Sequence, residues 1–281
     1  MKLSATFAIA ATLAVTAASA QWLDYPSPRM PLTRGGKPDL AAKAPRTHDG
    51  KPDLSGVWQI HPPDPDEFIR LFGDPGPGIT AGDDNREQSK YFFNLFVDFK
   101  PGEEPLRPEA AAQTQKNRQF LDTPTSHCLP YGLPNRYLNH RPFKIFQTGD
   151  ALAIFYEIDG AMRQIHLDGR PLPKDPFPSW LGYSTGKWVG ETLVVETAGF
   201  NDKAWLDARG HLQSQALHVT ERLHRRDFGH MDIEATVDDP KILTEPVTIR
   251  FIVDLLPNTD VLETFCSEGE RDRAHMPSAA P

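Results

Sequence analysis

Residues 199–218 combine several ionisable side chains with a stretch that is longer than a hairpin turn needs. Around Trp205 the stretch carries two carboxylates and two imidazoles: Asp202, Asp207, His211 and His218. Carboxylate–imidazole pairs transfer protons in enzymes, and the same groups bind metal ions. The spacing D-x4-D-x3-H-x6-H matches no metal-ligand signature. We therefore predict acid–base chemistry at Asp202, Asp207 and His211, in which Asp207 orients His211 as general base or acid. A divalent metal ion bound by these groups is the less favoured alternative, and no other cofactor is indicated.

A structural role is the alternative for this stretch. Asn201 and Asp202 are typical of a turn, and Asp207 has a surface partner within reach in Arg209. The sequence contains no phosphate-binding loop, H-E-x-x-H or C-x-x-C motif. The common nucleotide-binding and zincin assignments therefore have no support.

Three more charged residues fall on strand faces that are otherwise apolar. Period-two alternation places Glu221, Arg163 and Glu157 in such stripes. An inward charge is costly unless it is paired. We predict that Glu221 joins the catalytic residues, and that Glu157 and Arg163 face each other across the Asp159-Gly160 turn and bind polar substrate groups. The alternative is a structural ion pair or a position at a barrel rim. Replacing Glu221 with Gln is expected to stabilise the fold.

The chain has only two cysteines, Cys128 and Cys266. In an exported protein the favoured prediction is a disulfide between them. The alternatives are two buried free thiols, or a catalytic Cys128 beside His127. The last is weak, because neighbouring residues in a strand point apart.

The second half of the chain predicts short strands joined by tight turns. The strands are expected at 55–60, 143–148, 151–158, 161–167, 181–188, 191–198, 217–225, 230–237, 246–254 and 261–266. Such a meander must close or stack to hide its edges. We predict a mainly β protein whose antiparallel meander forms a lipocalin-like barrel or strongly curved sheet, with a helix at 108–121.

The first 142 residues differ from the rest of the chain in composition and in hydrophobic pattern. Residues 1–20 have a positive start, an apolar core and a small-residue site ending at Ala20, which predicts a signal peptide cut after Ala20. Residues 21–54 are proline-rich and predict an extended arm that docks on a surface. Residues 55–281 are expected to form one β-rich domain, with an irregular and helical insertion at 61–142.

Composition narrows the classes of partner. Lys plus Arg is 30 and Asp plus Glu is 38, for a net charge of -8, so a nucleic-acid partner is not expected. After residue 20 no apolar run approaches the ~18 residues of a membrane span. The 27 prolines exclude a bundle of long helices. A periplasmic or secreted location follows from the predicted signal peptide.

Several longer motifs resemble a family of uncharacterised secreted bacterial proteins. They are Asp49-Gly-Lys-Pro-Asp-Leu-Ser-Gly-Val-Trp58, Cys128-Leu-Pro, Asp168-Gly-Arg-Pro, Trp188-Val-Gly-Glu-Thr-Leu-Val-Val-Glu-Thr-Ala-Gly-Phe-Asn-Asp202, Trp205-Leu-Asp207, His218-Val-Thr-Glu-Arg222 and Asp239-Pro240. The resemblance covers most of residues 45 to 275. It implies a β-barrel and export, and it implies no particular reaction.

Three functions fit these observations. The first is an exported hydrolase, lyase or isomerase whose barrel-mouth pocket acts on a small, partly apolar or aromatic molecule. Its substrate would contact His218 and stack on Tyr156, Trp180 and Trp205. The second is a lipocalin-like carrier of a hydrophobic ligand, and the third is an envelope protein that binds a partner. A buried carboxylate–imidazole cluster would favour the enzyme, and an apolar cavity would favour the carrier. A filled barrel with an exposed apolar patch would favour the partner-binding protein.

Overall fold

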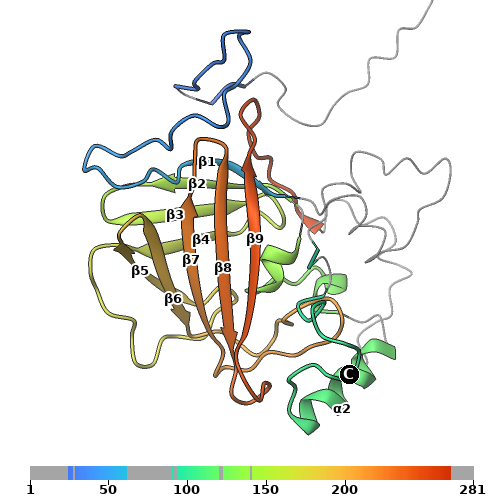
Figure 1. Cartoon of the computed structure of the whole chain (residues 1–281). Helices are drawn as coiled ribbons and strands as arrows, with labels where there is room; N and C mark the ends of the chain where they lie inside the picture. Colours follow the sequence, from blue (N-terminus) through green and yellow to red (C-terminus); the bar gives the residue numbers. More distant parts are fainter. Residues whose placement is uncertain are drawn as a thin grey trace, which may run out of the picture.

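The strands of this protein close into a barrel. The computed structural model describes residues 25–27, 29–61, 90–91, 94–119, 123–139 and 141–266. The predicted signal peptide and its cleavage site lie outside these residues. In the described part, nine strands pair in sequence order and the last pairs with the first (Figure 1). They are β1 (Gly56–Ile60), β2 (Phe143–Gln147), β3 (Ala151–Tyr156), β4 (Met162–His166), β5 (Tyr183–Val189), β6 (Thr192–Ala198), β7 (His218–Arg225), β8 (His230–Asp238) and β9 (Val247–Leu255). The predicted lipocalin-like barrel is confirmed.

One neighbouring pair departs from the predicted antiparallel meander. Strands β4 and β5 are parallel, with Ile165 opposite Ser184 and His166 opposite Thr185. A parallel pair requires the chain to return to the same end of the sheet before the next strand starts. Residues 167–182 make that return, and their closely spaced prolines prevent them from forming a strand of their own. The expectation of antiparallel pairing throughout was therefore wrong at this junction.

The C-terminal part of the chain also differs from its prediction. The strand expected at 261–266 is absent, and Thr264 makes only an isolated bridge to Ile158. Cys266 nevertheless reaches Cys128, at the end of the short 3-10 helix η1 (Pro124–His127), and the predicted disulfide is confirmed. Because its sulfur is in the disulfide, Cys128 is not a free nucleophile.

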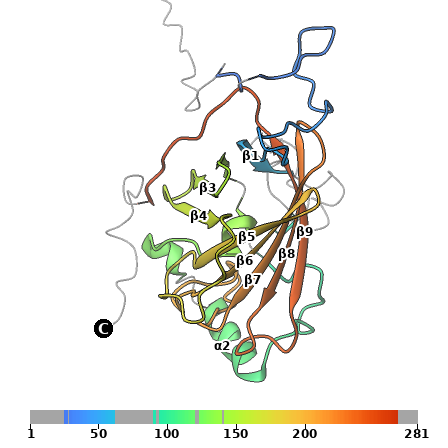
Figure 2. The same cartoon turned by 90° about the vertical axis from the view of Figure 1, so that its left-hand side faces the viewer.

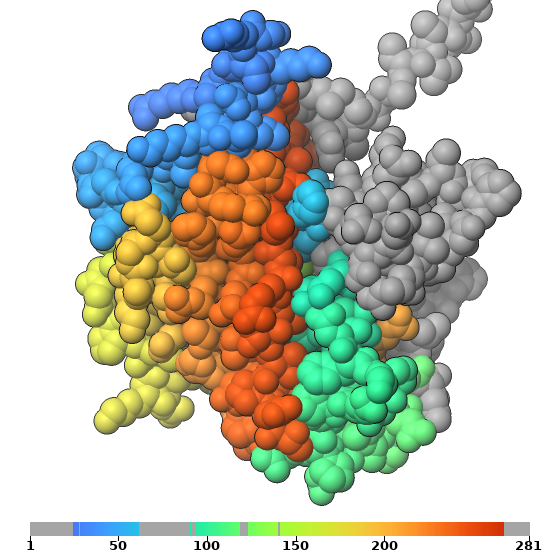
Figure 3. All heavy atoms as spheres, in the orientation of Figure 1, coloured from blue at the N-terminus to red at the C-terminus, as the bar shows by residue number. Residues whose placement is uncertain are grey.

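The described part of the N-terminal arm packs across one end of the barrel (Figure 3). The amides of Phe228 and Gly229, in the β7–β8 turn, donate to the carbonyls of Ala42 (2.8 Å) and Leu40 (2.7 Å). The guanidinium of Arg225 donates to the carbonyls of Asp53 and Phe228, and so joins the arm to the same turn. Burial lowers the pKa of Arg225 to about 10.

Helix α2 (Pro108–Gln119) lies near the opposite end of the barrel from the arm (Figures 1 and 2). It matches most of the predicted helix 108–121, and it begins with a proline, which is favoured in the first turn. A second 3-10 helix, η2 (Asn135–Leu138), is buried. No helix within the described ranges is both long and apolar enough to cross a membrane.

The barrel interior contains two apolar clusters with a polar layer between them. Along the inward face of β7, Val219 belongs to one cluster and Leu223 to the other, and Glu221 lies between them. At this level Arg163 of β4 bonds to Glu221, and Ser184 of β5 and Thr197 of β6 bond to Arg163. Five cavities among the described residues have volumes of about 10 to 670 Å³, and Glu221, Arg163 and Tyr137 line none of these five.

Candidate active site

A tight hairpin within residues 205–212 brings Asp207 and His211 together. Trp205 bridges Leu212, and the amide of Leu206 donates to the carbonyl of His211 (2.8 Å). The Oδ1 atom of Asp207 accepts from the amide of Arg209 (2.8 Å), which closes the turn. This local fold places Nδ1 of His211 at 2.7 Å from Oδ2 of Asp207. The predicted pairing of Asp207 with His211 is therefore present.

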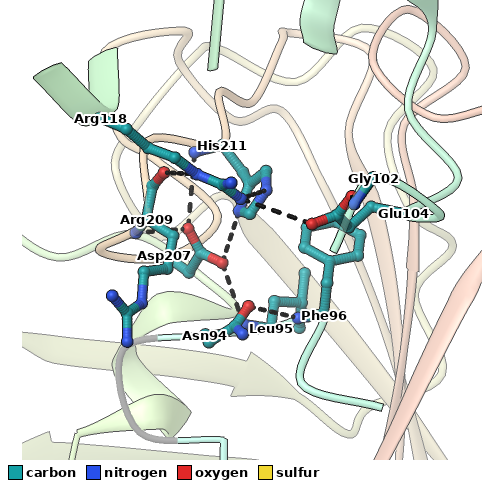
Figure 4. A network of polar contacts seen from close by, with 9 residues as sticks. All are labelled: Asn94, Leu95, Phe96, Gly102, Glu104, Arg118, Asp207, Arg209 and His211. Atoms are coloured by element: carbon teal, nitrogen blue, oxygen red, sulfur yellow. Dashed lines mark hydrogen bonds and ion pairs between the residues drawn. The ribbon is translucent and has the colours of Figure 1, made fainter. Parts of the chain in front are cut away.

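Both nitrogens of the His211 ring are engaged (Figure 4). The Nη2 group of Arg118 lies 3.2 Å from Nε2 of His211. Because a guanidinium only donates, Nε2 must accept, and the proton of the neutral ring is then on Nδ1, where it is donated to Asp207. Asp207 also accepts from the amide of Leu95 (2.9 Å), so its carboxylate is held by donors from two segments of the chain. Both Asp207 and His211 are fully buried.

Helix α2 and residues 94–99 hold the hairpin in place. Asn117 donates its side-chain amide to the carbonyl of Gly210 (2.9 Å), and Nε of Arg118 donates to the carbonyl of Arg209 (3.1 Å). The ring of Phe96 packs edge-on against the ring of His211, with centroids 4.4 Å apart. The imidazole is thus fixed by side chains from three separate segments.

Gly210 sits at the closest approach of the hairpin to α2. Its φ is +92°, and a Cβ atom there would lie 2.8 Å from Cβ of Asn117. We expect Gly210→Ala to destabilise the protein by about 1–3 kcal/mol and to lower turnover, because both the backbone and the contact are strained. Thermal unfolding and activity measurements test this. The matched control is Gly190→Ala, which has φ +61° and open space around it. Equal destabilisation by the two substitutions would contradict the role of the contact.

A cavity of about 330 Å³ opens next to the imidazole. Phe96, Phe99 and Trp205 give it apolar walls, and Arg118 and Arg209 give it cationic ones. His211 is not exposed in this cavity, since Phe96 and Arg118 lie in front of it. The volume falls within the usual range for small-molecule sites.

Glu221 and Arg163 are paired with each other inside the barrel. Nη1 of Arg163 lies 2.9 Å from Oε1 of Glu221, and Nη2 contacts Oε2. Ser184 (3.0 Å) and Thr197 (2.8 Å) accept the remaining guanidinium donors. The burial of Arg163 by itself would lower its pKa, but the charge of Glu221 more than offsets this and holds the pKa well above the usual value.

Two tyrosines complete the internal layer. The hydroxyl of Tyr137, from η2, donates to Glu221, and burial together with that carboxylate holds its pKa well above the usual value. Tyr156 is buried, with the guanidinium of Arg136 4.6 Å from the centre of its ring. Burial raises the pKa of Tyr156 as well. Both phenols are neutral at physiological pH, so the layer holds one balanced ion pair.

The predicted pairing of Glu157 with Arg163 was wrong. The turn is longer than two residues, so Ile154 lies opposite Arg163, and Glu157 falls in the turn. The Oε2 atom of Glu157 accepts from the amide of Leu262 (3.3 Å), and its Oε1 lies 3.8 Å from Arg141. Burial raises the pKa of Glu157.

The remaining predicted residues do not converge on His211, so the expected single polar centre was wrong. Asp202 is exposed and accepts a long contact from Gln215 (3.5 Å). His218 is paired in register with Asp238 at the start of β7. Trp180 is half-buried and does not line the cavity. Of the aromatic residues predicted to stack on a substrate, only Trp205 lines the cavity beside His211.

Sequence reasoning missed Arg118 and Phe96, which both touch His211. Arg118 lay within the predicted helix, but nothing in its neighbourhood indicated that the helix would pack on the 205–212 hairpin. It also missed Tyr137, Ser184 and Thr197 of the internal layer. The alternation of β6 contained a signal for Thr197, whose side chain is fully buried on a strand otherwise rich in valine.

The comparisons with known proteins assign no family. No family model matches the chain, and no curated protein matches it. Within the ranges that the structure describes, no group of three or more His, Cys, Asp or Glu side chains is arranged to hold a metal ion.

Proposed function

We propose that this protein is an exported enzyme that performs acid–base chemistry on a small, partly aromatic molecule in the cavity beside His211. The single observation that carries the proposal is the buried pair of Asp207 and His211, joined at 2.7 Å next to that cavity. Export to the periplasm or out of the cell is supported by the disulfide and by the signal-peptide pattern of residues 1–20. The resemblance to secreted bacterial proteins points the same way.

The pair has the parts that a general base requires. Nδ1–H of His211 is held by the carboxylate of Asp207, which orients the ring and stabilises the imidazolium. Nε2 then takes a proton from a water molecule or from a carbon acid. The electron pair left on the water oxygen attacks the substrate, whereas the pair left on carbon rearranges within the substrate. The same Nε2–H later returns the proton to the leaving group or to another carbon. Hydrolases, lyases and isomerases share this step.

The carrier alternative receives less support. A carrier of a hydrophobic ligand needs an apolar cavity, whereas an ion pair with satisfied hydrogen bonds lies inside this barrel.

The partner-binding alternative is favoured by one feature, an outer groove of about 540 Å³ lined by Phe146, Phe155 and Met162. Phe146→Ser should leave turnover at His211 unchanged, because the two sites are built from different segments.

The test is an activity screen followed by substitution. The full chain, expressed with its own N-terminus, is offered small aromatic esters, amides and lactones, and carbon acids in D₂O whose deuterium uptake is followed by NMR. For any substrate found, His211→Asn and Asp207→Asn should lower kcat/KM by about 10²-fold or more. The asparagine at 211 retains a donor for Asp207 but has no nitrogen that accepts a proton.

Asp239→Asn is the matched control for loss of a buried carboxylate. Asp239 is also fully buried and accepts from the amide and hydroxyl of Ser214 (2.6 and 2.7 Å), with no imidazole beside it. This variant should lose stability and retain the kcat/KM of its folded fraction. Full activity in folded His211→Asn protein would overturn the proposed mechanism.

A further inference from the structure

We propose that the substrate of this site carries a carboxylate group, which binds Arg118 and thereby uncovers Nε2 of His211. The inference rests on the proposed function and names the class of molecule that the site accepts: a small aromatic or otherwise ring-shaped acid.

The imidazole of His211 has no free acceptor nitrogen in this structure. Its ring is fully buried, Nδ1 is bonded to Asp207, and Nε2 accepts from Arg118 at 3.2 Å. A nitrogen that already accepts a hydrogen bond from a guanidinium has no lone pair available for another proton. For His211 to act as a base, the Arg118 contact must break.

Arg118 is the most exposed of the side chains that contact the ring. Its side chain is 45% exposed, whereas Asp207 is fully buried in the hairpin. Its Nε donates to the carbonyl of Arg209, which holds the stem of the side chain, while Nη2 reaches His211 and lies 3.5 Å from Glu104. The guanidinium is a rigid plane, so a change in the side-chain torsions of Arg118 that carries Nη2 away from His211 also breaks the Nε contact with Arg209.

A ligand carboxylate in the cavity would pair with Arg118 better than Glu104 does. The contact between Arg118 and Glu104 is long, and Oε2 of Glu104 already accepts from the amide of Gly102 (2.7 Å). A ligand carboxylate is able to take two parallel hydrogen bonds from a guanidinium, which a 3.5 Å contact does not provide. Phe99 and Trp205 offer apolar surface for a ring attached to that carboxylate.

Binding and activation are coupled in this arrangement. Each terminal nitrogen of Arg118 carries two N–H groups, so the carboxylate frees His211 only when the whole guanidinium turns toward the ligand. Nη2 then leaves His211, and Nε2 becomes a free acceptor. The bond between the proton and its donor atom in the substrate or water then breaks, its electron pair stays with that atom, and the proton bonds to Nε2. Without an acid in the cavity, Arg118 keeps the base covered.

The first experiment is calorimetric titration of the full chain with phenylacetate and with phenylacetamide, its uncharged analogue. Wild-type protein should bind phenylacetate at least about tenfold more tightly than the amide. Arg118→Gln should abolish this preference. The matched control is Lys116→Gln, an exposed residue in the same turn of α2 that loses the same charge, and it should retain the preference. Equal binding of acid and amide by the wild type, or an unchanged preference in Arg118→Gln, overturns the proposal.

The second experiment separates this inference from the proposed function. Nitrogen-15 NMR of the His211 ring should show Nε2 moving toward the position of a free acceptor when phenylacetate is added, and no movement with phenylacetamide. His211→Asn should still bind phenylacetate, since Arg118 and the cavity remain. If the enzyme screen fails while phenylacetate still binds through Arg118 and shifts Nε2, the acid site stands and only the catalytic function is lost. An Nε2 signal that phenylacetate leaves unmoved overturns the coupling.

Discussion

Replacing Arg163 with Met is expected to destabilise the barrel by about 3–5 kcal/mol, the usual cost of leaving one partner of a buried ion pair alone. Glu221 is fully buried, and its two carboxylate oxygens are held by Arg163 and Tyr137. Without the guanidinium, the carboxylate must either remain charged in an apolar interior or take up a proton. Urea unfolding monitored by tryptophan fluorescence measures the change in the free energy of unfolding.

Two further variants make the result interpretable. Arg222→Met removes an arginine from the exposed face of the same strand as Glu221, and it should change stability by no more than about 0.5 kcal/mol. The double variant Arg163→Met with Glu221→Leu removes both charges and should recover much of the loss. An Arg163→Met protein as stable as the wild type would show that the pair has no structural role.

The same pair reverses the expectation for Glu221→Gln. From the sequence, removing a charge from an apolar stripe was expected to stabilise the fold. The structure shows that the carboxylate has a full set of donors, so its neutralisation leaves Arg163 as an uncompensated buried cation. We now expect Glu221→Gln to destabilise the protein.

Opening the disulfide is the second large expected effect. Cys128 and Cys266 are 138 residues apart, and the loop-entropy model assigns such a cross-link about 5 kcal/mol of stability. Reduction, or Cys128→Ser together with Cys266→Ser, should therefore lower the free energy of unfolding by about 2–5 kcal/mol. The bridge ties the end of η1 to a C-terminal segment that belongs to no strand and that is otherwise held by side-chain and isolated backbone contacts, such as those of Thr264 with Glu157.

The disulfide prediction has a simple control. Adding reductant to the double serine variant should produce no further loss of stability, because there is no bridge left to open. Thiol titration of the unfolded, unreduced protein should find none free. Two free thiols in protein from an oxidising compartment, or equal stability with and without reductant, would contradict the prediction.

Most strands were predictable because alternation between faces is a local property of the sequence. The hairpin from β7 to β8 follows from two alternating runs and a short turn, and its register keeps the buried face apolar except for Glu221 and Arg225. The strand predictions were wrong where the pairing of a segment does not follow from its local sequence pattern. The run 261–266 has strand-like residues but no strand partner, and the parallel β4–β5 junction depends on how residues 167–182 cross the barrel.

The Asp207–His211 pair is predictable from the sequence, because the two residues are four apart in one hairpin and the turn that joins them is closed by their own neighbours. The surroundings of that pair depend on long-range packing. Arg118 precedes His211 by 93 positions and Arg163 precedes Glu221 by 58, so no periodicity links them. Contacts over such sequence separations form only when the strands close into a barrel and the helix packs against it. A buried charge must be paired, and its partner is the opposite charge that the closed fold places next to it.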